Sequence, residues 1–243
     1  MIAGLRLAVS LLTVLPVGLR PDGPITAPEA GRAMTVAPLV GLIVGGAAAG
    51  MMAGAQEVGL SGLLAATLAV ATVAAVTRGL HLDGLADTAD GLGSGRPADG
   101  ALAVMRSGDT GPFGVVTLVL VLLVQVTAAA QAGPAALLLA VVTGRVALAW
   151  SCRRGVPAAR HDGLGVLVAS SVRTLAALGA VVLTAVVAGL VDLPAAAAVV
   201  AGVVAGEVLL RLAVRRLGGV TGDVLGAVCE TAVTTSLVVL AGT

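Results

Sequence analysis

The stretch that decides the fold is residues 112–131, which read PFGVVTLVLVLLVQVTAAAQ. No charged side chain interrupts it, and a helix of roughly 20 apolar residues is long enough to cross the hydrocarbon core of a bilayer. Further apolar stretches lie on both sides of it, near residues 2–19, 34–55, 60–77, 134–152, 173–190, 193–210 and 224–242. The sequence therefore predicts an all-α fold, a polytopic transmembrane helical bundle with about seven or eight spans.

The composition of the whole chain supports a membrane protein. Of its 243 residues 58% are hydrophobic and 11% are charged, whereas a soluble domain has about 25% charged residues. The mean hydropathy is +1.09, so too few polar side chains remain to coat a water-soluble core. No repeat or linker divides the chain, and we expect one integral membrane domain over residues 1–243. The first apolar segment has no clear cleavage site, so we expect it to stay as a short span or an interfacial helix.

The connections between the expected spans are of two kinds that alternate along the chain. Those near 56–59, 132–133 and 191–192 are short and hold no Arg, whereas those near 20–33, 78–111, 153–172 and 211–223 hold most of the fourteen. The positive-inside rule places the arginine-rich connections on the cytoplasmic side of the cell inner membrane. The net charge of +1 and the near absence of aromatic residues argue against a nucleic-acid partner.

Three aspartates follow the third long span at positions i, i+4 and i+7, namely Asp83, Asp87 and Asp90. On a helix this spacing puts the three carboxylates on one face. Carboxylates so close repel one another unless a cation neutralises them, and carboxylate oxygens suit Mg²⁺ or Mn²⁺. A solvated acidic face would show the same spacing, but this stripe continues directly out of an apolar span. His81, just before it, is open to three interpretations: a metal ligand, a base or a packing residue.

The segment after the aspartates supplies candidate groups for binding phosphate. Gly91 and Gly93 would let the backbone approach a ligand closely. Arg96 follows them, and Arg106 precedes the next span. Arginine forms bidentate contacts with phosphate, so we expect these four residues to bind substrate.

Two later segments are expected at the same face. One carries Arg145 near the inner end of a span and Arg160 beyond it, and the other carries Thr221 and Asp223. Ionisable residues within apolar runs, here Arg145 and Glu207, are functional candidates by default, although an ion pair between helices is an equally good interpretation. Together the segments offer carboxylates for a metal and Arg for phosphates, the groups needed for metal-assisted phosphoryl transfer.

The aspartate segment also resembles a known family. Residues 81–92, HLDGLADTADGL, resemble the signature of the cobalamin synthase family, the adenosylcobinamide-GDP ribazoletransferases, without a gap. Residues 13–16, 38–41, 111–116 and 218–227 are similar to other blocks of that family in the same order. One departure is that Ser107 stands where the family often has an acid, while the acid of this chain is Asp109.

The resemblance implies an activity, a cofactor and roles for residues. The implied enzyme is embedded in a membrane and joins α-ribazole or its 5′-phosphate to adenosylcobinamide-GDP, giving adenosylcobalamin or its 5′-phosphate and GMP. It is Mg²⁺-dependent, and Asp83, Asp87 and Asp90 would bind the metal at the GDP diphosphate. Asp223 would complete the metal set or act as the base on the ribose hydroxyl.

Two other functions stay open on the sequence alone. Asp87–Gly91 also resembles the start of the CDP-alcohol phosphotransferase motif, and such an enzyme of lipid synthesis would release CMP. A cation transporter could use the same aspartates, although transporters usually carry their charges near the bilayer midplane. The sequence is compatible with a homo-oligomer and does not fix the oligomeric state.

Overall fold

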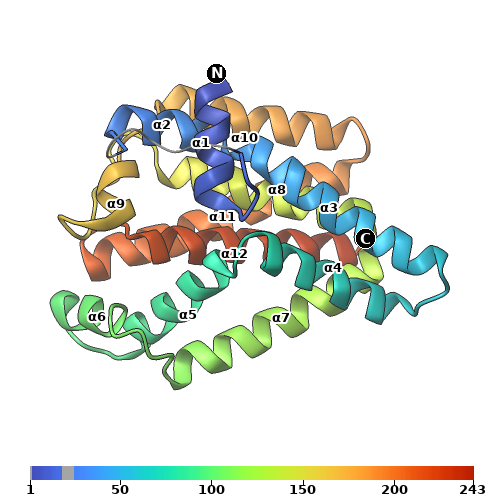
Figure 1. Ribbon diagram of the computed structural model, residues 1–243, viewed down its shortest axis with the longest axis horizontal. Helices are drawn as coiled ribbons and strands as arrows, with labels where there is room; N and C mark the ends of the chain where they lie inside the picture. The colour runs from blue at the N-terminus through green and yellow to red at the C-terminus, as the bar shows by residue number, and fades with distance from the viewer. Residues whose placement is uncertain (1, 18–24) are drawn as a thin grey trace.

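The structure, a computed structural model, describes residues 2–17 and 25–243 and is drawn in Figure 1. Arg20 and the last residues of the expected segment 2–19 lie outside this range. The described residues form helices α1 Ile2–Leu12, α2 Ala27–Thr35, α3 Ala37–Glu57, α4 Gly62–Val76, α5 Leu80–Gly93, α6 Ala98–Val104, α7 Pro112–Ala132, α8 Pro134–Ser151, α9 Gly163–Val168, α10 Thr174–Gly189, α11 Leu193–Leu217 and α12 Gly222–Ala241. Within these residues the only β pairing is two isolated bridges, so the expected all-α bundle is confirmed.

Each expected span coincides with one helix, but not every helix is long enough to cross a bilayer alone. Five are long and apolar enough, namely α3, α7, α8, α11 and α12, and the bent pair of α4 and α5 makes a sixth if it is counted as one span. Helices α1 and α10 have 11 and 16 residues, fewer than the roughly 20 that a full crossing needs. The described chain thus gives five or six spans, where the sequence predicted seven or eight.

The helix boundaries follow from local sequence. Proline stands in the first turn of α3, α7, α8 and α11, where its missing N–H leaves no hydrogen bond unmade. Ser61 and Asp192 cap α4 and α11, and the carboxylate of Asp192 accepts a hydrogen bond of 2.7 Å from the Ala195 N–H. Thr221 caps α12 in the same way.

A sharp bend separates the apolar helix α4 from the acidic helix α5. The two helix axes differ by 87°. Arg78 and Gly79 both have positive φ, 55° and 65°, a conformation that glycine adopts readily and arginine rarely. The bend therefore ends the apolar run and starts the helix that carries Asp83.

Helices α8 and α12 form the centre of the bundle. In the most apolar part of each helix, 67% of the residues of α8 and 61% of those of α12 are buried. The value is 22% for α7, which lies on the outside. The Ser236 hydroxyl of α12 donates a 3.0 Å hydrogen bond to the Ala198 carbonyl of α11. Because α12 also packs against α5 and α7, its first turn is held against the first half of α5.

The two kinds of connection lie at opposite ends of the molecule. Figure 1 shows the short connections α3–α4, α7–α8 and α10–α11 at one end of the long axis. The connections α5–α7, α8–α10 and α11–α12 lie at the other end, together with α2, α6 and α9. The alternation predicted from the sequence is therefore present, and the arginine-rich segments share one end.

Candidate active site

A cavity of about 420 Å³ lies at the arginine-rich end. Its walls come from α1, α2, α5, α8, α9, the first turn of α12, and the connections before α7 and α9. The ionisable side chains that line it, apart from His81, are Asp83, Arg106, Arg160, Asp162 and Asp223. Four of these five were candidates from the sequence, so segments far apart in the chain meet here as predicted.

The aspartates of α5 lie close to Asp223 of α12. Asp83 is exposed, Asp87 is half-buried and Asp90 is buried. The charge on Asp87 is repelled by Asp83, Asp223 and Asp90 and attracted by Arg160. Within the described residues, three other carboxylates and one guanidinium, that of Arg160, thus act on Asp87, and the group has an excess of negative charge.

A glycine explains how close α12 comes to the acidic helix. Gly84 lies between Asp83 and Asp87, on the contact between α5 and α12. A Cβ atom added to Gly84 would lie 2.6 Å from the Asp223 carbonyl oxygen and 2.8 Å from the Asp223 Cα, closer than such atoms can approach. The absent side chain therefore lets the backbone of Asp223 pack directly against α5, beside two of its aspartates.

The first turn of α12 forms part of the cavity wall. The Thr221 hydroxyl accepts a 3.2 Å hydrogen bond from the Val224 N–H and donates one of 3.1 Å to Asp223 Oδ2. Gly222, between them, also lines the cavity. The N-terminal end of a helix carries partial positive charge and free N–H groups, which favours an anionic ligand.

Two arginines face this cavity. Arg160 Nη1 lies 3.8 Å from Asp223 Oδ2, while its Nη2 donates a 2.8 Å hydrogen bond to the Leu102 carbonyl. Its buried Nε has no hydrogen-bond partner among the residues that the structure describes. Arg106 Nη2 lies 3.3 Å from Asp162 Oδ1, and both side chains are exposed. Arg160 Nη1 makes no hydrogen bond within the described residues. Arg160 is therefore held in place yet keeps this donor for a ligand, as Arg106 keeps donors at the rim.

Three other predicted binding residues are not brought to the cavity wall. Arg96 is exposed and lies outside the lining. A Cβ on Gly91 would meet the Met105 side chain, and one on Gly93 would meet the ring of Phe113. These two glycines therefore serve the packing of α5 against the segments that follow it.

Asp90 has backbone partners that the sequence did not indicate. Its Oδ2 accepts a 2.7 Å hydrogen bond from the Gly111 N–H and its Oδ1 one of 2.9 Å from the Gly114 N–H. Gly111 is the N-cap residue of α7, so this buried carboxylate stabilises the start of that helix. Its predicted role as a metal ligand stays a prediction, beside this structural role.

The oxygens of Asp83 and Asp87 fit a divalent cation. Neither carboxylate takes part in a hydrogen bond or ion pair within the described residues. A hard cation prefers such oxygen ligands, and Asp223 faces them from α12. The donor set therefore suits Mg²⁺, with charge to neutralise and oxygens left free.

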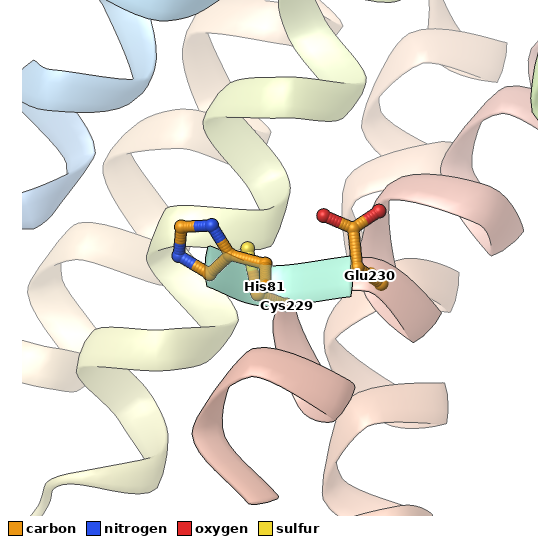
Figure 2. A group of neighbouring side chains, drawn as sticks. All are labelled: His81, Cys229 and Glu230. Carbon is orange, nitrogen blue, oxygen red and sulfur yellow. The ribbon is translucent and has the colours of Figure 1, made fainter. Parts of the chain in front are cut away.

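A second polar group lies buried between the same two helices and α8. Figure 2 shows His81 of α5 with Cys229 and Glu230 of α12, whose potential ligand atoms lie within 4.8 Å of one another. Arg145 of α8 has no exposed surface and interacts electrostatically with all three. The sequence predicted that Arg145 binds phosphate. In the structure Arg145 is buried and does not line the cavity, so that prediction is not supported.

The charges of this buried group balance without a bound cation. The positive charge of Arg145 attracts the carboxylate of Glu230, but in the described residues no ion pair joins them, and Nε and Nη2 of Arg145 have no hydrogen-bond partner. Glu230 Oε2 accepts a 2.8 Å hydrogen bond from Gln125 Nε2. A divalent cation bound there would add positive charge next to a buried guanidinium, which is unfavourable at low dielectric. We therefore interpret the group as structural, although neither nitrogen of His81 has a hydrogen-bond partner in the described part of the chain.

Sequence reasoning missed two contributors to the cavity. Asp162 pairs with Arg106, which lies 56 residues earlier, and nothing local to either residue indicates that pair. Gly84 sits within the aspartate stripe, where only its position between Asp83 and Asp87 could have drawn attention to it. Both act through contacts between distant segments.

Comparison with known proteins identifies relatives over the full length. Residues 4–241 match the family described as cobalamin-5-phosphate synthase. The chain is 42% identical to an adenosylcobinamide-GDP ribazoletransferase of Frankia casuarinae, with 98% of this chain and 94% of the relative covered. A relative of the same name from a Nocardioides species is 44% identical, over 96% of this chain and 95% of the relative. No solved structure shows a significant match.

Proposed function

The chain belongs to the cobalamin-5-phosphate synthase family, and from that premise we propose that it acts as an adenosylcobinamide-GDP ribazoletransferase. The observation that carries the proposal is the meeting of Asp83 and Asp87 with Asp223 and Arg160 beside one cavity. Carboxylates for a cation beside a guanidinium for phosphate are the parts that phosphoryl transfer needs. Family membership favours this reaction over the CDP-alcohol and transporter alternatives.

The reaction exchanges one phosphate ester partner for another. An oxygen of the ribose of α-ribazole, or of its 5′-phosphate, bonds to the phosphorus next to the cobinamide. The bond from that phosphorus to the oxygen bridging to GMP breaks, and GMP leaves with the bonding electrons. The ribose hydroxyl gives up its proton as its oxygen attacks.

The cavity suits the reacting part of the substrate rather than the whole of it. Its volume of about 420 Å³ lies at the lower end of small-molecule sites, which span roughly 300–1,000 Å³. A diphosphate and a ribose fit such a space, whereas the corrin ring is left to lie outside. We propose that Arg160, Arg106 and the first turn of α12 bind the phosphates.

The proposed cofactor is Mg²⁺, with Asp83, Asp87 and Asp90 as the predicted ligands and Asp223 facing them. When bound there, it would supply positive charge that stabilises the phosphate oxygen with which GMP leaves. Among the four, Asp83 and Asp87 have free oxygens, whereas those of Asp90 already accept two backbone hydrogen bonds. We therefore propose that Asp90 contributes chiefly by fixing α7 beside the site.

Asp223 is proposed to take the proton from the ribose hydroxyl. It is half-buried, and its Oδ2 is oriented by the Thr221 hydroxyl at 3.1 Å. Arg160, at 3.8 Å from the same oxygen, keeps the carboxylate in place without a short, direct hydrogen bond. A carboxylate oriented in this way can accept a proton within hydrogen-bond reach.

We further propose that the protein lies in the cell inner membrane and that its cavity opens on the cytoplasmic side. The support is that the arginine-rich connections share one end of the bundle (Figure 1), and that residues of these connections line the cavity. The positive-inside rule assigns that end to the cytoplasm.

The test is GMP release by the full chain in detergent, supplied with adenosylcobinamide-GDP and α-ribazole, with and without Mg²⁺. We expect Mg²⁺-dependent GMP release coupled to cobalamin formation, and a loss of roughly 100-fold or more in Asp87→Asn. Asp99→Asn is the matched control, because Asp99 is an exposed aspartate of α6 that is not among the charged groups acting on Asp87. Full activity in Asp87→Asn, or an equal loss in Asp99→Asn, would contradict the proposed site.

A further inference from the structure

A second groove, of about 280 Å³, lies between the C-terminal half of α11 and the connection that follows α8. Its charged lining consists of Arg153, Glu207, Arg211 and Arg215, and its apolar lining includes Leu210 and Val214. It shares no lining residue with the cavity of the proposed active site. We propose that this groove binds the phosphate headgroup of an anionic phospholipid.

The groove carries a net positive charge that the protein itself does not neutralise. Three arginines face one glutamate, which leaves a formal charge of +2 among the lining residues. Glu207 Oε1 accepts a 2.8 Å hydrogen bond from Arg211 Nε, and its Oε2 lies 3.1 Å from Arg153 Nη1. Within the described residues Arg215 has no ion pair. An anion would therefore find one unpaired guanidinium and a second, on Arg211, that is 69% exposed.

Contacts with Glu207 and Trp150 fix the side chain of Arg153, and Glu207 also pairs with Arg211. The Trp150 indole N–H donates a 2.9 Å hydrogen bond to Glu207 Oε2. Arg153 stacks over the indole ring, with 4.2 Å between its guanidinium carbon and the ring centroid. Because these contacts fix the guanidinium of Arg153 before a ligand arrives, less side-chain freedom is lost on binding.

The surface leading to the groove favours a lipid over a free phosphate. Val204 and Val208 precede Arg211 and Arg215 at a spacing of i, i+4, i+7 and i+11, which places the four on one face of α11. Both valines are more than half exposed, and α11 is one of the helices long enough to span a bilayer. An apolar stripe that ends in two arginines matches an acyl chain that ends in a phosphate.

The single tryptophan of the chain makes the groove directly observable. Trp150 is the only tryptophan, and it contacts two residues of the groove lining, Arg153 and Glu207. A lipid with brominated acyl chains quenches a nearby indole. The intrinsic fluorescence of the full chain in a non-ionic detergent therefore reports which lipid occupies the groove.

The experiment compares brominated phosphatidylglycerol with phosphatidylcholine carrying the same brominated chains. We expect saturable quenching of Trp150 by phosphatidylglycerol, at a concentration roughly tenfold lower than phosphatidylcholine requires. Arg215→Gln should reduce this preference several-fold, and Arg211→Gln with Arg215→Gln should remove it. Both side chains are exposed, so these variants should fold.

The control is Arg32→Gln, because Arg32 is an exposed arginine of α2 outside the groove. It should leave the lipid preference unchanged. Equal quenching by the two lipids, or a preference that survives in the double variant, would overturn the proposal. So would loss of the phosphatidylglycerol quenching in millimolar inorganic phosphate at constant ionic strength, since the ligand would then be a free phosphate.

Discussion

Two polar groups lie between α5 and α12, and they differ in how far the protein itself balances their charges. Asp83 and Asp223 line the cavity, Asp87 lies next to them outside the lining, and the guanidinium of Arg160 is 3.8 Å from the nearest carboxylate oxygen. Seven residues further along α12, Glu230 is buried with Gln125 at 2.8 Å and the charge of Arg145 nearby. The open group keeps an excess of negative charge, whereas the buried group is balanced within the protein.

The difference separates a site that needs a ligand from one that stabilises the fold. A buried charge must find its counter-charge inside the protein, because no solvent reaches it. A cluster open to a cavity can leave its carboxylates unpaired, and a cation from solution then completes it. Free energies of unfolding should therefore respond differently in the two groups, and four measurements test this.

The largest effect on stability is expected in the buried group. Arg145→Met leaves Glu230 without its counter-charge and should lower the free energy of unfolding by about 3–5 kcal/mol. Adding Glu230→Met removes both charges and should recover most of that loss. Denaturant titration in mixed micelles measures both. If the double variant were as unstable as Arg145→Met alone, the two charges would not be partners.

The next effect is that of Mg²⁺ on the open group. At a Mg²⁺ concentration 100 times its dissociation constant, the free energy of unfolding should rise by about 2.7 kcal/mol. Asp87→Asn should lose this response while Asp99→Asn keeps it, which the same titration measures with and without the metal. An equal response in the wild type and in Asp87→Asn would place the cation elsewhere.

The close contact between α5 and α12 should show a smaller effect. Gly84→Ala puts a Cβ against the Asp223 backbone, so we expect a loss of about 2 kcal/mol in unfolding free energy together with a fall in GMP release. Gly50→Ala is the control, because nothing lies within 4 Å of that Cβ, and a helix-interior glycine replaced there gains about 0.5–1 kcal/mol. Unchanged activity in Gly84→Ala would show that the close contact between α5 and α12 does not determine the geometry of the active site.

The smallest expected effect distinguishes Asp90 from the other aspartates. Asn at position 90 keeps one acceptor oxygen for the N–H groups of Gly111 and Gly114, so Asp90→Asn should be about 1 kcal/mol less stable. Asp83→Asn should be as stable as the wild type or slightly more, since it relieves repulsion. Thermal unfolding without metal compares them, and equal midpoints would mean that Asp90 does not stabilise α7.

The positions of the helices could be predicted because hydropathy is a local property. The run at residues 112–131 and the proline at its start define α7 without knowledge of any other segment. The spacing of Asp83, Asp87 and Asp90 likewise predicted one acidic helix face. The number of full crossings was less predictable, because α10 is apolar but has only 16 residues and the bend at Arg78 and Gly79 depends on backbone angles.

The partners of individual side chains could not be predicted from the sequence. Arg145 and Arg160 looked alike as candidates for binding phosphate, yet one is sealed inside the bundle and the other faces the cavity. The reason is that a helix sequence fixes which residues share a face, but not which neighbour that face meets. The neighbour depends on how each helix is rotated and packed in the bundle. Packing in turn depends on contacts between distant residues, such as that of Gly84 with the backbone of Asp223.

The sequence by itself therefore determined an all-α membrane bundle, the end that holds the arginines, and the acidic stripe of α5. Only the tertiary structure decided that Gly84 lets Asp223 pack directly against this stripe, that Asp90 caps α7 and that Arg145 lies buried near Glu230. Apolar runs and residue spacing act over a few helical turns and are written in consecutive residues. Electrostatic interactions act through space, between residues that the fold brings together from distant parts of the chain, such as Asp83 and Asp223, which are 140 positions apart.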